Sequence, residues 1–322
     1  MNMKKPLTAL LAGLMLVGCS SSNQTSVTDG NETLMTIGNK TYTVNDEYRC
    51  LKGSTAGASG VIFLASQPIY DAEVGRTDEI LKEAESRLED YSSSSEDFET
   101  QIKSLGFADK QDYLERALIP SVQSSFLFEK YLTDAKDSII EKYDPVLVSI
   151  IETDSEDNAN KALQALKDGQ DAGKVSAQYA SEGATYKGTE QIVLATDQTL
   201  PTTLLNSILD AGKEGVLDQV FTNDTSTDDK TYYVANVVST DYDKNLPKIK
   251  TLFQANQTVQ TEMQIFYFKK YNLEIHDQAI YDYYKGMNPE YLVDQPELYE
   301  KALESANSES QSKQQNKNAV KK

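Results

Sequence analysis

The chain has 322 residues and a formal net charge of −19. This acidic excess argues against nucleic acid as a partner, because affinity for nucleic acid rests on cationic side chains that neutralise phosphate. One histidine, His276, and two cysteines leave no cluster with metal-ligand spacing, and no glycine-rich phosphate loop occurs, so we expect neither a metal nor a cofactor.

The first nineteen residues have the features of a lipoprotein leader. Lys4 and Lys5 precede an apolar run and a Leu-Val-Gly-Cys sequence that ends at Cys19. The run is shorter than the roughly 20 residues that a membrane-spanning helix needs, and it fits a signal peptide. The ending resembles the bacterial lipobox, which implies cleavage after residue 18 and lipidation of Cys19. The alternative is an ordinary secreted protein in which Cys19 lies near the cleavage site by chance.

Residues 34–144 are predicted to form a hairpin followed by helices. Residues 34–37 and 40–43 flank a Gly-Asn pair that is typical of a tight turn. Thr43 and Asp46 have the spacing of a capping box, which predicts a helix from about residue 44. Cys50 has no disulfide partner once Cys19 is lipidated, and we expect it to be a small buried residue.

The periodicity changes near residue 145. Residues 145–151 are a nearly continuous apolar, β-branched run, typical of a buried strand. Further strands are predicted over 191–194, 216–221 and 231–238, and helices over 155–167, 174–180 and 201–209. The resulting β-α-α-β-α-β-β order indicates a compact α+β unit.

The chain becomes helical again from about residue 246. These helices are too few to bury their own apolar faces, so we expect them to pack against the first helical segment, with the α+β unit inserted between the two. Residues 296–322 are poor in core-forming side chains and predict a disordered tail. The predicted fold class is therefore α+β and mostly helical.

The lipobox, the hairpin, the stretch DKQDYLERALIP, the inserted α+β unit and the helical return together resemble the PrsA foldase lipoproteins, over about residues 1–295. The resemblance implies a helical chaperone domain like those of SurA and trigger factor, formed by the N- and C-terminal segments, with an inserted parvulin-like domain. It implies unfolded exported proteins and the lipid bilayer as partners, at the extracytoplasmic face of the cell membrane, and it leaves a homodimer open. The expected parts are a signal peptide (1–18), a lipidated tether (19–33), helical segments (34–144 and 241–295), a parvulin-like domain (145–240) and a tail (296–322).

The parvulin resemblance also implies three site positions. The histidine of the first strand corresponds to Ser149, and the histidine of the last strand corresponds to Tyr233. Glu190 is the nearest substitute for the acidic or thiol position of that family. The hydroxyls of Ser149 and Tyr233 either form a residual polar network or are ordinary polar groups in a site that has lost catalysis. Because neither histidine is present, we expect weak or lost prolyl isomerase activity, with retained activity as the alternative.

Aromatic residues of the return helices are candidate contacts for unfolded clients, and core packing is the alternative for each. They are Phe266, Tyr267, Phe268, Tyr281, Tyr283 and Tyr284. His276 lies in the same region, where we expect an exposed or interdomain side chain without a catalytic role.

Two other classes of lipoprotein remain as alternatives. A solute-binding protein needs repeated βαβ units in two lobes, whereas strands are predicted here only in a hairpin and one small unit. A structural or adhesive surface protein would bind no unfolded clients.

Overall fold

The computed structural model describes residues 27–223 and 230–304. The chain divides into two compact units, Met1–Ala65 with Tyr271–Lys322, and Ser66–Lys270. The predicted signal peptide, Cys19 and the first part of the tether lie outside the described residues. Among the helices of the described ranges, none combines the length and apolar character needed to cross a bilayer.

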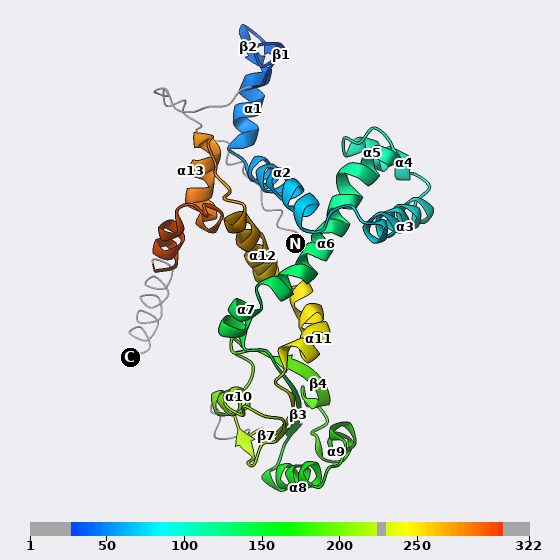
Figure 1. The fold of residues 1–322 in the computed structure, drawn as a ribbon, viewed down its shortest axis with the longest axis vertical. Helices are drawn as coiled ribbons and strands as arrows, with labels where there is room; N and C mark the ends of the chain where they lie inside the picture. The colour runs from blue at the N-terminus through cyan, green and yellow to red at the C-terminus, as the bar shows by residue number, and fades with distance from the viewer. Residues whose placement is uncertain (1–26, 224–229, 305–322) are drawn as a thin grey trace, which may run out of the picture. The chain divides into compact units, whose positions relative to one another are not determined.

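The first unit begins with the predicted hairpin. Strand β1 (Thr33–Ile37) pairs antiparallel with β2 (Lys40–Thr43), and Gly38 has a φ of 59° in the turn. Helix α1 (Val44–Lys52) follows directly (Figure 1). The capping box at its start is confirmed, because the Thr43 hydroxyl accepts from the Asp46 amide while the Asp46 carboxylate accepts from the Thr43 amide.

The N- and C-terminal segments of this unit are joined by polar contacts. The ammonium of Lys52, on α1, lies 2.6 Å from the carboxylate of Asp277, and both side chains are buried. Asp277 also accepts from the amides of Ala279 and Ile280, which caps helix α13 (Gln278–Met287). Because residue 52 and residue 277 are far apart in sequence, this buried pair fixes how the two ends of the chain meet.

Two predictions for the first unit are wrong. Cys50 is exposed rather than buried. It stands about 200° around α1 from the buried Lys52, because successive residues of an α-helix are about 100° apart. In the predicted tail, residues 296–304 are helical rather than disordered, and residues 305–322 lie outside the described residues. Pro296 is the first residue of this helix, a position where its missing amide hydrogen has no helical partner to lose.

The second unit contains the helices on either side of the α+β part. Helix α2 (Thr55–Glu73) runs from the first unit into it. The helices that precede the sheet are α3 (Asp78–Ser94), α4 (Phe98–Ser104), α5 (Lys110–Tyr113), a π-helical turn (Leu114–Leu118), α6 (Ile119–Asp134) and α7 (Lys136–Tyr143). Those that follow it are α11 (Tyr242–Gln254) and α12 (Gln257–Lys270). The return helices pack on the earlier ones as expected, since the ring of Phe266 contacts that of Tyr131 at 5.6 Å between centroids.

The α+β part is built on a small antiparallel sheet. Its strands are β3 (Val146–Thr153), β4 (Lys187–Val193), β5 (Gly215–Val216), β6 (Phe221–Thr222) and β7 (Tyr232–Ser239), in the order β4-β3-β7-β5 with β6 also on β7. Helices α8 (Glu156–Lys167) and α9 (Ala172–Tyr179) pack on one face, and α10 (Thr202–Leu209) packs on the other (Figure 1). Every strand pair in the described residues is antiparallel, which contradicts the two βαβ lobes of a solute-binding protein.

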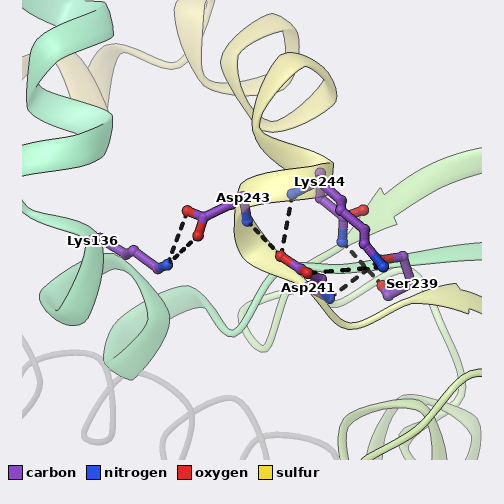
Figure 2. Close-up of polar contacts among 6 residues, drawn as sticks. Lys136, Ser239, Asp241, Asp243 and Lys244 are labelled. Atoms are coloured by element: carbon purple, nitrogen blue, oxygen red, sulfur yellow. Dashed lines mark hydrogen bonds and ion pairs between the residues drawn. The ribbon is translucent and has the colours of Figure 1, made fainter.

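The sheet is held to the helices at the point where β7 leads into α11 (Figure 2). Asp241 caps α11 by accepting from the amides of Asp243 and Lys244, and its own amide donates to the hydroxyl of Ser239. The Lys136 ammonium donates to both carboxylate oxygens of Asp243, at 2.9 and 2.8 Å. Helix α7, the end of β7 and the start of α11 are thereby connected within one unit.

Tyr242 makes this junction sensitive to alkali. Its hydroxyl donates to the carbonyl of Leu132 at 2.7 Å, and burial, with a smaller effect of the Asp243 charge, raises the pKa of Tyr242 to about 12. A raised pKa means that the neutral phenol contributes stability fully below its ordinary pKa of 10, and that this contribution is lost as the pH rises through about 12.

We expect Tyr242→Phe to cost about 1 kcal/mol of unfolding free energy at neutral pH, because one buried hydrogen bond is lost. The variant should also lose less stability than the parent chain between pH 10 and 12. Urea unfolding at a series of pH values measures both effects. An equally steep alkaline decline in the variant would show that Tyr242 is not a source of it.

Candidate functional site

The two hydroxyl residues of the predicted site lie on opposite faces of the sheet. Val148 and Ile150 pack toward α10, so Ser149 between them points to the α8 face. On β7 it is Tyr233 that belongs to the α10 cluster, whereas the next residue, Val234, belongs to the α8 cluster. Of the two alternatives for these hydroxyls, the polar network between Ser149 and Tyr233 is therefore contradicted. The register explains the error, since Tyr233 pairs with Glu152, an odd number of residues from Ser149.

Glu190 does not join Tyr233 either. Ser149 is buried, and its cross-strand partners are Glu190 on β4 and Asn236 on β7. The Glu190 side chain is half exposed and binds the ammonium of Lys248, on α11, at 3.0 Å. Its contact attaches the edge of the sheet to the helices.

The α10 face carries an aromatic pair over an apolar floor. The rings of Tyr186 and Tyr233 are 6.2 Å apart between centroids and meet edge to face at 70°. Beneath them lies a cluster of buried side chains from the sheet and α10, which includes Val148, Ile150, Leu200, Leu204, Leu205, Phe221 and Ala235. These side chains, and Tyr233 with them, form the core between the sheet and α10.

Polar contacts fix Tyr186 in place. Its hydroxyl lies 2.8 Å from that of Thr199, which also lies 2.7 Å from the carboxylate of Asp197. Because the Thr199 proton goes to the carboxylate, Tyr186 must be the donor to Thr199. The carboxylate of Glu152 accepts from the amides of Thr185 and Tyr186, at 2.9 and 3.3 Å, which positions the backbone on which Tyr186 stands.

The electrostatics keep Tyr233 in its neutral form. Burial first, then the charge of Glu152, raises the pKa of the Tyr233 phenol above its ordinary value. Rotation about a prolyl amide has a barrier of ~18–20 kcal/mol, and lowering it requires several groups aimed at the twisted amide. Of the three predicted positions, Tyr233 is buried on the α10 face and Ser149 and Glu190 lie elsewhere, so their polar groups are not aimed at one amide.

Sequence reasoning missed Tyr186. Strand β4 begins at Lys187, four residues before the predicted start at residue 191. With the longer strand, Tyr186 would have been placed at the edge of the sheet. Gly188 hid this signal, because its φ of 73° is unusual inside a strand and glycine lowers strand propensity.

The return-helix aromatics follow the core-packing alternative. Tyr267, Phe268 and Tyr284 are buried and provide no exposed contact surface. Phe266 is half-buried against Tyr131 and Tyr267, and the hydroxyls of Tyr281 and Tyr283 donate to Gln295 and Thr55. His276 is exposed, 3.6 Å from the carboxylate of Glu274.

Comparison with known proteins finds relatives that share one name. The foldase protein PrsA of Streptococcus mutans is 29% identical over 295 residues, which cover 85% of this chain and 83% of the relative. The chain is therefore similar to the PrsA foldases over most of its length. A foldase protein PrsA of Streptococcus agalactiae is 24% identical and covers 84% of this chain and 90% of the relative.

A solved PrsA structure from Bacillus cereus, described as a peptidylprolyl isomerase, covers 80% of this chain and 99% of its own, with 17% identity and a TM-score of 0.44. No protein-family model matches the chain.

Proposed function

We propose that the protein is a membrane-anchored chaperone that holds unfolded exported polypeptides and promotes their folding, with weak or no prolyl isomerase activity. The relatives named foldase, which align over most of this chain, support the general role. The anchor is proposed from the sequence alone, through lipidation of Cys19 on the extracytoplasmic face of the membrane.

The distribution of exposed apolar side chains is the observation that carries the proposal. In the second unit, the exposed large apolar residues of the described chain are Tyr91, Leu105 and Leu252. The first unit, although smaller, exposes Leu34, Met35, Ile37, Leu51, Phe63, Leu64, Tyr271, Met287, Tyr299 and Leu303. A unit that exposes many large apolar side chains has more apolar surface with which to contact other polypeptides.

Weak isomerase activity is proposed from the α10 face. Tyr233 is buried in the cluster between the sheet and α10, whereas Ser149 and Glu190 point elsewhere. The three predicted positions therefore do not aim their polar groups at one amide, which argues for little lowering of the barrier to rotation.

The test is suppression of aggregation by the full chain. A chemically unfolded protein is diluted into buffer, and light scattering is followed with and without an equimolar amount of this protein. We expect the scattering to fall at least several-fold, and to fall equally with Tyr186→Phe and Tyr233→Phe variants. Unchanged scattering with the parent chain would contradict the chaperone proposal. Loss of suppression in the two variants alone would move the client site to the α10 face.

A further inference from the structure

The outer edge of strand β1 is available to pair with another chain. Within the described residues, β1 pairs with β2 alone, in a sheet of two strands. All five residues of β1 are exposed, including Leu34, Met35 and Ile37 with 45%, 54% and 69% of their surface accessible. A strand at an edge directs alternate amide and carbonyl groups outward, where they can pair with another chain.

Strand β1 also lacks most of the features that protect such edges. Protected edges carry charged side chains, prolines or bulges. The sequence Thr-Leu-Met-Thr-Ile contains no charge and no proline, and the single irregularity lies between Thr33 and Met35, so the rest of the strand is regular. A two-stranded sheet is only marginally stable alone, and a third strand would stabilise it.

We infer that β1 is a docking edge for unfolded clients, which add an extended segment of about five residues to the hairpin as a third strand. This inference rests on the proposed function and names how the client is bound. Backbone hydrogen bonds supply the affinity and tolerate many client sequences. The side chains of Met35 and Ile37, which share one face of β1, contact alternate side chains of the client.

The acidic charge near β1 favours a client segment over a second copy of the chain as the binding partner of this edge. Asp29 and Glu32 precede the hairpin, and Asp46 and Glu47 lie in the first turn of α1. Against these four acidic residues stand Lys40 in the hairpin and Arg49 in the last turn of α1, in a chain with a net charge of −19. A second copy would bring the same acidic surface to the edge, and like charges repel. An apolar client segment flanked by lysine or arginine is therefore favoured over self-association.

The experiment uses the full chain and a labelled peptide of sequence KKVTVTVTKK, with binding followed by fluorescence anisotropy. Two matched peptides replace the lysines with glutamates or carry N-methyl groups on every amide of the central VTVTVT segment. We expect at least tenfold weaker binding for both, because the first loses charge complementarity and the second can donate no backbone hydrogen bond from either edge of that segment. Hydrogen exchange should show protection of residues 33–37 when the lysine peptide binds.

A variant pair checks the location. Met35→Lys with Ile37→Lys adds cations to the edge and should weaken binding of the lysine peptide at least tenfold. Leu105→Lys, at a residue 70% exposed in the second unit, should leave it unchanged. Circular dichroism and hydrogen exchange in α1 establish whether the double variant is folded. If it is not, the comparison of the three peptides on the parent chain tests the inference instead.

Three results would overturn the inference. One is equal affinity for the N-methylated peptide, and another is equal weakening by Leu105→Lys. The third is protection of residues 33–37 that appears without peptide and grows with protein concentration, which would make a second copy the occupant. If the parent chain still suppresses aggregation in any of these cases, only the docking edge is refuted and the proposed function stands. If the parent chain does not suppress aggregation, the proposed function itself is refuted.

Discussion

Replacing Lys52 by methionine should cost about 3–5 kcal/mol of unfolding free energy in the first unit. The substitution leaves the carboxylate of Asp277 buried without the ammonium that lies 2.6 Å away. The effect should reach beyond α1, because Asp277 also caps α13. Urea unfolding, followed by a fluorescent label on the exposed Cys50 in a Cys19→Ala chain, reports on this unit directly.

Two further variants separate charge from packing. Lys52→Met combined with Asp277→Asn removes both charges and keeps a capping side chain, so it should cost less than Lys52→Met alone. Arg116→Met breaks an exposed pair with Asp112 and should cost at most about 1 kcal/mol. The Asp277→Asn variant completes the comparison. If the double variant loses as much stability as Lys52→Met and Asp277→Asn lose together when measured singly, the two buried groups do not stabilise each other.

Gly188→Ala should destabilise the sheet by about 3 kcal/mol or more. Gly188 has a φ of 73°, and a Cβ built there would lie 2.3 Å from the carbonyl oxygen of Ala172 at the start of α9. Both atoms belong to rigid elements, so α9 would have to move away from β4. Thermal unfolding followed by circular dichroism measures the loss.

The matched control for this prediction is Gly183→Ala. A Cβ at Gly183 meets no atom within 4 Å, and this position has no positive φ. We expect a change within about 0.5 kcal/mol, as for most surface substitutions. Equal stability of the two variants would mean that α9 and β4 adapt to the added methyl group.

Local signals in the sequence predicted most of the elements. The Gly-Asn turn predicted the hairpin, the Thr43–Asp46 spacing predicted the start of α1, and the β-branched run predicted β3. Each of these signals depends on a few neighbouring residues. The exposure of Cys50 was not predictable in this way, because it depends on which side of α1 meets the C-terminal segment.

The candidate site was harder to predict, because it depends on register between strands. Ser149 and Tyr233 both alternate with apolar neighbours, and either residue could face α10. Only the pairing of Glu152 with Tyr233 decides that they face opposite ways. A shift of one residue in that pairing would have brought them together, and no local pattern in the sequence excludes it. Tyr186, which directly precedes β4, was missed because Gly188 near the start of that strand lowers strand propensity and has an unusual backbone conformation.

The most direct test of the central claim is refolding of an unfolded protein whose slow phase is limited by proline isomerisation, with this chain added in stoichiometric amount. Isomerisation takes tens of seconds at 25 °C, so its rate is easily separated from the yield of folded protein. A chaperone with little isomerase activity raises the yield several-fold and leaves the rate of the slow phase unchanged. A slow phase accelerated several-fold with an unchanged yield would contradict this account.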